Sequence, residues 1–357
     1  MFLVFAWLAA APAFAQAPSA LSDSAFAAMV ARMSETPGYF DTDNLISNED
    51  SYLHVLGALK REGVSGGAYI GVGPDQNYSY ITAIRPHVAF IVDIRRDNLL
   101  EHVWYKALFA MSRSRLEFLC LMFGRSPPSD TTGWGARDIA SLFAYIDAAP
   151  RDSATVARAR QRVMDAVRHG ALPMSPEDVA HIARMHAAFI NSGPALRFNS
   201  YGRAPAPYYP DFRRLAMETD RAGRQSSFLA HEADFQYVKS MHARNLIVPI
   251  VGDFAGDKAL ASIAQWLRVN HETVSAFYTS NVEQYLFRDG GFAQFAKSVA
   301  QMPRNERSVM IRSYFLGYHP QQVTGYHATQ LAQLMSAFVG REWRSYGELA
   351  TAELIAP

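Results

Sequence analysis

The chain has 357 residues, a formal net charge of +1 and 49% hydrophobic residues. This length suits one large domain or two ordinary ones, and the composition is that of a globular chain rather than a disordered one. The near-neutral charge, without a cluster of Lys and Arg among aromatic residues, gives no indication of nucleic-acid binding. The single cysteine, Cys120, excludes an intramolecular disulfide and a metal site built from cysteines.

The first residues have the pattern of a secretory signal peptide. Residues 2–11 are apolar but too few to cross a bilayer, and Ala13 and Ala15 form an A-x-A cleavage pattern. No Lys or Arg precedes the apolar stretch, so a hydrophobic N-terminal helix of a cytosolic protein is the alternative. We expect residues 1–15 to be a signal peptide of an exported protein, periplasmic or extracellular; otherwise the protein is cytoplasmic. No later stretch of the sequence is long and apolar enough to span a membrane.

Helical patterns come next. Residues 24–33 are amphipathic with the spacing of a helix, and Ser47 or Asn48 is expected to cap a second helix that ends near Arg61. We assign residues 16–63 to an N-terminal helical segment.

Four near-continuous apolar runs predict strands that are buried on both faces. They are residues 67–72, 88–93, 246–251 and 274–279. A long apolar helix, capped by Asp97 or Asn98, is expected after the second run, and residues 125–210 form an insertion of mostly helix and loop. Strands that alternate with helices predict an α/β fold. We expect a doubly wound, mostly parallel Rossmann-like sheet with helices on both faces, formed by residues 64–357.

A glycine turn follows the first predicted strand. Gly71 and Gly73 stand at its carboxyl end, where ligands bind in doubly wound sheets, and glycine lets a ligand approach the backbone. Asp93 ends the next strand, 20 positions after Gly73. An acid at this spacing can accept hydrogen bonds from both hydroxyls of a ribose. The unit therefore predicts a nucleoside site, and the alternative is a turn that needs glycine only for its backbone.

These segments resemble those of class I S-adenosylmethionine-dependent methyltransferases. The stretch "YIGVGPDQN" is similar to the strand and loop that pass beside the methionine part of the cofactor, and "FIVDI" is similar to the segment that carries the ribose acid. The stretch "VPIVGDF" resembles the segment whose acid contacts the adenine amino group, and "FYTSNV" stands where the fourth strand and catalytic loop lie. The resemblance covers residues 64–110 and 245–290.

The resemblance implies S-adenosylmethionine as the cofactor and a set of residues that contact it: Gly71, Gly73, Asp75, Asn77, Asp93, Asp253 and Phe254. The sequence departs from the family pattern in three places. Tyr69 replaces an acid two positions before the first glycine, Asp75 replaces the third glycine, and residues 279–283 lack the N-P-P-F type of signature.

Further polar residues are candidates for a cofactor or substrate pocket: Asn48, Glu49, Tyr52, Ser280 and Asn281. The first three lie upstream of the first strand, where a segment often folds over the cofactor in this class. Ordinary turn and capping chemistry is the alternative. No H-E-x-x-H, G-x-S-x-G or P-loop motif is present, so we assign no metal site and no catalytic residue.

We expect a methyltransferase-like protein that binds a small-molecule ligand and no nucleic acid; the sequence does not specify the methyl acceptor or the oligomeric state. Methyl transfer needs mainly alignment of acceptor and sulfonium, so few catalytic side chains are required. An exported protein would meet little S-adenosylmethionine, because that compound is made in the cytosol. An exported, non-catalytic Rossmann-like binding protein is therefore the alternative. An NAD-dependent oxidoreductase is less favoured, since the third glycine is missing.

Overall fold

Six strands form one sheet at the centre of the molecule, in the order β3-β2-β1-β4-β5-β6. The computed structural model describes residues 20–201, 209–315 and 328–356, so the expected signal peptide lies outside the described residues. The strands are β1 (Ala68–Gly71), β2 (Val88–Asp93), β3 (Ile247–Val251), β4 (Val274–Ser280), β5 (Arg304–Phe315) and β6 (Ala328–Leu334).

The first five strands are parallel to one another, and only the last pairing is antiparallel. In register, Ile70 of β1 lies between Phe90 of β2 and Phe277 of β4, while β6 runs antiparallel to β5. All residues of β1, β2 and β3 are buried. A parallel sheet with this burial needs cover on both faces, and the protein is accordingly an α/β protein.

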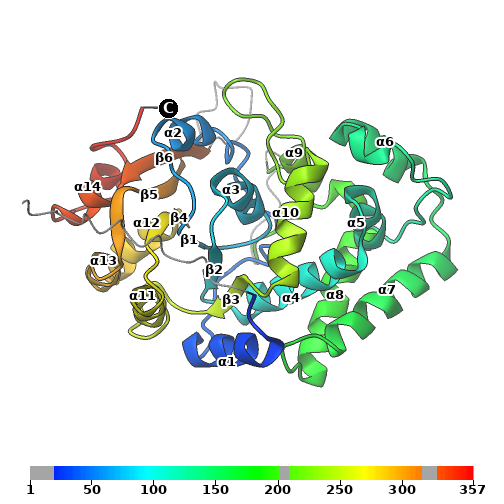
Figure 1. Ribbon diagram of the computed structural model, residues 1–357, viewed down its shortest axis with the longest axis horizontal. Helices are drawn as coiled ribbons and strands as arrows, with labels where there is room; N and C mark the ends of the chain where they lie inside the picture. The colour runs from blue at the N-terminus through cyan, green and yellow to red at the C-terminus, as the bar shows by residue number, and fades with distance from the viewer. Residues whose placement is uncertain (1–19, 202–208, 316–327, 357) are drawn as a thin grey trace, which may run out of the picture.

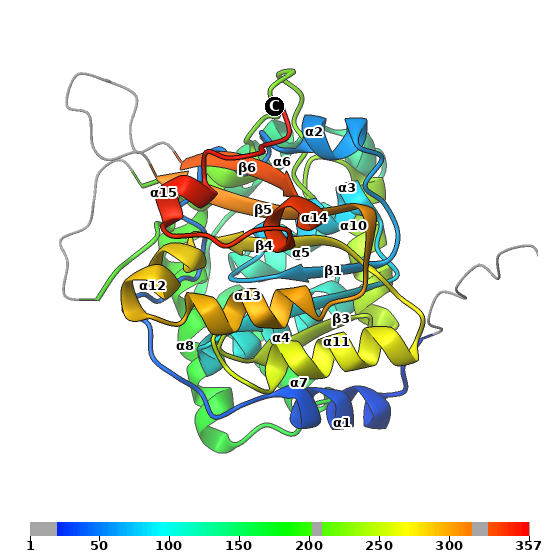
Figure 2. The same ribbon diagram turned by 90° about the vertical axis from the view of Figure 1, so that its left-hand side faces the viewer.

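Helices supply that cover. Figure 1 shows α3, α4 and α10 on one side of the sheet and α11 and α13 on the other, and Figure 2 views the sheet from the α11 and α13 side. The helices before β3 are α1 (Asp23–Met33), α2 (Leu56–Arg61), α3 (Gln76–Ile84), α4 (Arg96–Met111), α5 (Arg115–Met122), α6 (Ile139–Ala148), α7 (Ser153–Arg168), α8 (Pro176–Ser192), α9 (Phe212–Ala216) and α10 (Glu232–Ala243). Those after β3 are α11 (Ala259–Val269), α12 (Val282–Asp289), α13 (Phe292–Ala300), α14 (Met335–Val339) and α15 (Tyr346–Leu349). Two short 3₁₀ helices, Trp134–Ala136 and Gly193–Ala195, complete the set.

The predicted strands and most predicted helices are confirmed. Each of the four apolar runs forms a strand, β1 to β4, and the amphipathic residues near the N-terminus form α1. The insertion between residues 125 and 210 contains α6, α7 and α8, which makes it largely helical as expected.

Two helix predictions were wrong at their ends. The helix expected from Asn48 begins only at Leu56, because the polar residues before it are buried in tertiary contacts. The long helix after β2 begins at Arg96, with Arg95 at the N-cap and no side-chain cap, so neither Asp97 nor Asn98 caps it.

That same apolar stretch forms two helices instead of one. It breaks at Ser112, whose hydroxyl donates to the Leu108 carbonyl, and Ser114 then caps α5 by accepting from the Glu117 backbone N–H. Serine side chains compete in this way for backbone groups and favour helix ends.

Gly71 allows the end of β1 to pack tightly against its own neighbours. A Cβ at this position would overlap Asn77 Oδ1 and lie 2.8 Å from the Tyr69 ring, so only glycine fits. Its backbone does not require a positive φ.

We predict that Gly71→Ala destabilises the fold by about 1–3 kcal/mol or more, the cost of overpacking a buried site. Urea unfolding followed by circular dichroism measures this. Gly347→Ala is the matched control, because a Cβ there meets no atom within 4 Å. A Gly71→Ala variant as stable as the control would contradict the packing argument.

Candidate functional site

The turn between β1 and α3 lies at the carboxyl edge of the sheet, beside the end of β2. Gly73 has a φ of +82°, a backbone conformation that side chains other than glycine rarely adopt. A Cβ on Gly73 would lie no closer than 3.5 Å to its nearest neighbour, Asn44 Nδ2. Gly73, unlike Gly71, is therefore needed for its backbone conformation, and a Cβ there would make only ordinary van der Waals contacts.

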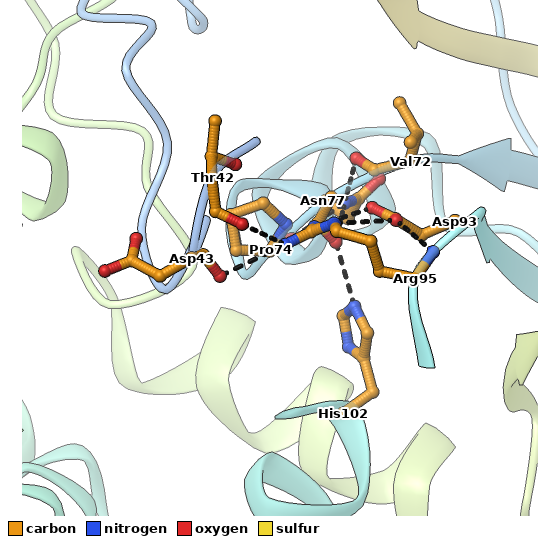
Figure 3. A network of polar contacts seen from close by, with 9 residues as sticks. Thr42, Asp43, Val72, Pro74, Asn77, Asp93, Arg95 and His102 are labelled. Carbon is orange, nitrogen blue, oxygen red and sulfur yellow. Dashed lines mark hydrogen bonds and ion pairs between the residues drawn. The ribbon is translucent and has the colours of Figure 1, made fainter. Parts of the chain in front are cut away.

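Asn77 and His102 hold the carbonyl groups of this turn from inside the protein (Figure 3). Asn77 Nδ2 donates to the carbonyls of Val72 (2.9 Å), Gly73 (3.2 Å) and Pro74 (2.7 Å), while its Oδ1 accepts from Tyr69 OH at 2.8 Å. Asn77 therefore shapes the turn, and no side chain caps α3, whose N-cap position is Asp75.

His102 contributes to the same turn from α4. Its Nε2 lies 3.0 Å from the Gly73 carbonyl and its Nδ1 lies 2.8 Å from Tyr78 OH. Burial lowers the pKa of His102 to about 4, so the ring is neutral at neutral pH. Because a carbonyl can only accept, Nε2 carries the proton and Nδ1 accepts from the tyrosine.

Asp93, the predicted ribose acid, forms a buried ion pair with Arg95. Its Oδ1 accepts from the Arg95 backbone N–H (2.9 Å) and Nε (3.1 Å), and its Oδ2 accepts from NH2 (2.9 Å). Both side chains are only 6% exposed. The guanidinium thus takes the positions from which two ribose hydroxyls would donate, and a nucleoside can bind Asp93 in the expected way only if Arg95 moves.

Arg95 also fixes the segment that precedes the sheet. Its NH1 donates to the carbonyls of Thr42 (3.3 Å) and Asp43 (3.1 Å), as Figure 3 shows. Thr42 in turn forms an antiparallel bridge with Ser200, near the end of the helical insertion. One guanidinium therefore joins the end of β2 to the segment at residues 42–43, which contacts the insertion.

Acidic side chains gather around this guanidinium. Glu101, on α4, is buried, and desolvation raises its pKa well above the usual range; the nearby charges of Asp75, Asp43 and Asp93 raise it further, while Arg95 lowers it. Burial of its carboxyl group raises the pKa of Asp75 to about 7. The edge therefore holds more carboxyl groups than positive charges, and Asp75, with a pKa of about 7, is partly protonated at neutral pH.

Several buried polar atoms here lack a hydrogen-bond partner within the described residues. They are Thr42 Oγ1, Asn98 Nδ2, Glu101 Oε1, Trp104 Nε1, Tyr105 OH and Ser200 Oγ. Leaving a buried donor or acceptor unpaired costs about 1–3 kcal/mol. Their number in this one region favours polar occupants beside the turn, either ordered water or a ligand.

A second polar network brings together the predicted pocket residues Glu49 and Ser280. Glu49 is buried and accepts from Tyr278 OH (2.6 Å), Gln330 Nε2 (2.7 Å) and Ser280 Oγ. Burial raises the pKa of Glu49. The network lies where β1 and β4 diverge, and Gln76 Nε2 links it to α3 by donating to Tyr278 OH at 2.9 Å.

The other predicted residues have separate surroundings. Asn281 Oδ1 lies 3.4 Å from Ser280 Oγ, at the edge of the Glu49 network. Asn48 is half-buried, and Tyr52 is buried and donates to the Leu215 carbonyl. At the end of β3, Asp253 Oδ1 accepts from the Ala255 N–H, while Phe254 packs against Phe277 and Phe295 in the core.

The sequence analysis missed the residues that hold this edge together. Arg95, Glu101, His102 and Tyr278 were not singled out, although Glu101 and His102 interrupt an otherwise apolar helical stretch. Charged and polar residues inside an apolar helix are a sign of buried polar contacts. That sign was available in the sequence.

Two cavities of the molecule lie away from this edge. One, of about 210 Å³, is lined by residues of α2, β6 and the C-terminal segment, and the other, of about 450 Å³, by residues of α5 and α7. Within the described residues no group of three His, Cys, Asp or Glu side chains could hold a metal ion. None of the helices in the described ranges is long and apolar enough to cross a membrane.

Two overlapping segments of the chain, residues 44–188 and 177–339, match one protein family, described as Domain of unknown function (DUF7790). The chain belongs to this family. The matched region includes the glycine turn, Asp93, Arg95 and the Glu49 network, and it begins just after Thr42 and Asp43. A search of curated proteins found no match to the chain.

We predict that Arg95→Ala lowers stability by about 3–5 kcal/mol, because it leaves the Asp93 carboxylate buried without its partner. Chemical unfolding measures the loss. Arg96→Ala is the matched control: Arg96 is 43% exposed, and its partner Asp178, although only 9% exposed, keeps the hydrogen bond from the Ser175 backbone N–H, so we expect a loss of about 1 kcal/mol or less. Equal losses in the two variants would contradict this account.

We also predict that Asp75 makes the protein less stable as pH rises from about 4 to about 7. Its pKa in the folded protein, about 7, exceeds the ordinary aspartate pKa of 3.8, so the unfolded chain releases the proton first and unfolding is favoured. Above pH 7 both states are ionised and the penalty is constant. Asp75→Asn should remove this part of the pH dependence and be more stable than the wild type at pH 8.

Asp138→Asn is the control for that experiment. Asp138 caps α6, and its hydrogen bond from Ser141 lowers its pKa, so its contribution to the pH dependence has the opposite sign. Unfolding midpoints in urea at pH 4.5 and pH 8 distinguish the two. Parallel profiles for Asp75→Asn and the wild type would show that Asp75 titrates normally.

Proposed function

We propose that this protein is an S-adenosylmethionine-binding, methyltransferase-like protein with a doubly wound, Rossmann-like fold. The strand order β3-β2-β1-β4-β5, all parallel, supports this fold, because it is the order of the doubly wound nucleotide-binding sheets. In such sheets the ligand lies beyond the carboxyl ends of the strands, near the point where the order reverses. Here that point lies between β1 and β4, beside Gly73.

The observation that carries the choice of ligand is the excess of carboxyl groups at this edge. Asp43, Asp75, Asp93 and Glu101 lie close enough for their charges to interact, and Arg95 is the positive charge among them. S-adenosylmethionine carries a sulfonium and has a net positive charge. A sulfonium beside these carboxyl groups would favour their ionised form, whereas the pyrophosphate of NAD would favour the protonated, neutral form, and this difference supports the methyltransferase-like function over the oxidoreductase.

Arg95 donates to the Asp93 carboxylate at the position proposed for the ribose. Its N–H groups donate hydrogen bonds to this carboxylate as ribose hydroxyls would. Binding of S-adenosylmethionine would therefore replace the guanidinium donors with hydroxyl donors. The Glu49 network, which includes Ser280 and Asn281, lies on the β4 side of the glycine turn. It is the candidate region for a methyl acceptor.

The alternative is an exported, non-catalytic binding protein that has kept the fold. The buried pair of Asp93 and Arg95 favours it, because this pair closes the position expected for a ribose. Under this alternative the glycine turn serves only the backbone and the packing of Asn77.

Thermal unfolding of the full chain with S-adenosylmethionine, S-adenosylhomocysteine and NAD distinguishes these functions. A ligand at 100 times its Kd stabilises by about 2.7 kcal/mol, which raises the Tm by several degrees. We expect a shift with S-adenosylmethionine and none with NAD. The shift should disappear in Asp93→Ala and be kept or enlarged in Arg95→Ala, because the competing guanidinium is gone.

Arg96→Ala is again the control, and its ligand-induced shift should equal that of the wild type. Comparing the shift within each variant separates binding from the variant's own stability. No shift in any protein, including Arg95→Ala, would reject the adenosyl ligand and favour the non-catalytic alternative. A shift with NAD that requires Asp93 would favour the oxidoreductase.

A further inference from the structure

A cleft of about 450 Å³ lies between α5 and α7, where the helical insertion meets the helix that precedes it. In Figure 1 these helices lie to the right of α4, away from the sheet. Four arginines line the cleft: Arg113, Arg125, Arg158 and Arg162. One carboxylate, Glu117, also lines it.

Three of the four guanidinium groups that line this cleft form no ion pair with a described residue. Arg113 is paired with Glu117 through NH2 and Oε1, 2.5 Å apart, so the carboxylate of the cleft is already neutralised. Arg125, Arg158 and Arg162 form no ion pair with any described residue of the chain. A chain with a formal net charge of only +1 thus keeps three unpaired guanidinium groups in one cleft.

Two of these guanidinium groups are held by neutral acceptors. Arg125 donates to the carbonyls of Ile146 (3.2 Å) and Phe123 (3.3 Å), and Arg158 donates to Thr155 Oγ1 at 2.9 Å. These acceptors are neutral, although Thr155 Oγ1 in turn donates to Asp152, whose charge interacts with that of Arg158. Burial and the neighbouring charge of Arg151 lower the pKa of Arg125, while the charge of Asp147 raises it.

The remaining lining is partly apolar. Met111, Leu121 and Pro127 provide apolar surface, and Ser126 and Thr155 provide hydroxyl groups. The volume falls within the range of small-molecule pockets, about 300–1,000 Å³, and such pockets combine apolar walls with a few polar groups. The cleft is therefore suited to a ligand with an anionic group and an apolar part.

We propose that the α5–α7 cleft binds a small organic phosphate, with its phosphate between Arg125, Arg158 and Arg162 and its apolar part against Met111 and Leu121. Phosphate is the anion that suits several guanidinium groups at once, because each presents a planar fork of N–H donors to its oxygens. No aromatic side chain lines the cleft, so it lacks the stacking surface on which single-stranded nucleic acids bind.

This site is separate from the candidate adenosyl site. None of its lining residues belongs to the glycine turn or to the Glu49 network, and α7 packs on α4 and α8 rather than on the sheet. The proposal therefore does not depend on the proposed function, and the two can fail independently.

Isothermal titration of the full chain with 1-naphthyl phosphate tests the site. We expect one binding site per chain, and at least tenfold weaker affinity in Arg158→Gln/Arg162→Gln, which removes two of the three unpaired charges. Arg160→Gln/Arg168→Gln is the matched control, because it removes the same charge from the same helix at positions that do not line the cleft. Its affinity should stay within about twofold of the wild type.

Two further probes define the ligand class. Neutral 1-naphthol should bind at least tenfold more weakly than 1-naphthyl phosphate, and a twelve-residue oligothymidylate should not compete with it. Equal weakening in both double variants would show a general charge effect and overturn the site. Binding that is unchanged in Arg158→Gln/Arg162→Gln, absence of binding at millimolar concentration, or competition by the oligonucleotide would also overturn it.

Discussion

The Arg95 guanidinium is the interaction on which the carboxyl edge of the sheet depends. It neutralises Asp93 and donates to the carbonyls of Thr42 and Asp43. Burial and the neighbouring carboxylates raise the pKa of Glu101, and the positive charge of Arg95 lowers it. A buried guanidinium with these partners is costly to desolvate and costly to separate. The same contacts that stabilise the edge therefore also decide whether a ligand can reach Asp93.

The interior beside this edge contains several buried polar and charged side chains. Glu49 sits in a network with Tyr278, Ser280 and Gln330, and a second buried pair joins Glu283 to Arg312 at 2.6 Å, both fully buried. These groups lie at the ends of β4 and β5, under the segment that precedes the first strand. Glu49 accepts three hydrogen bonds in this network, whereas Glu283 Oε1 and Arg312 NH2 have no partner within the described residues. Buried hydrogen bonds favour one arrangement of a core, because breaking them leaves further buried groups unpaired. This network fixes how residues 42–55 cover the sheet.

Much of the fold could be read from local pattern. The four apolar runs became β1 to β4 because strands buried on both faces must be continuously apolar, and α1 follows from its amphipathic spacing. Local sequence patterns gave wrong helix ends where polar residues bind partners that are far away in the sequence. Residues 48–55 look helical, yet Glu49 is held by β4, and Tyr52 is held by α9 through the Leu215 carbonyl. β5 and β6 were not predicted, because their polar residues pair across the sheet.

The sequence by itself determined the α/β fold class and the position of the glycine turn, because burial and backbone geometry restrict the residue types allowed at each position. It also placed Gly73, Asp75, Asn77 and Asp93 at one edge, since parallel strands end on the same side. The tertiary structure alone decided what these residues do. Asn77 supports the turn, Asp93 is paired with Arg95, and Glu49 reaches Ser280 from 231 positions away. Such contacts depend on which segments the fold brings together, and no local pattern in the sequence encodes that.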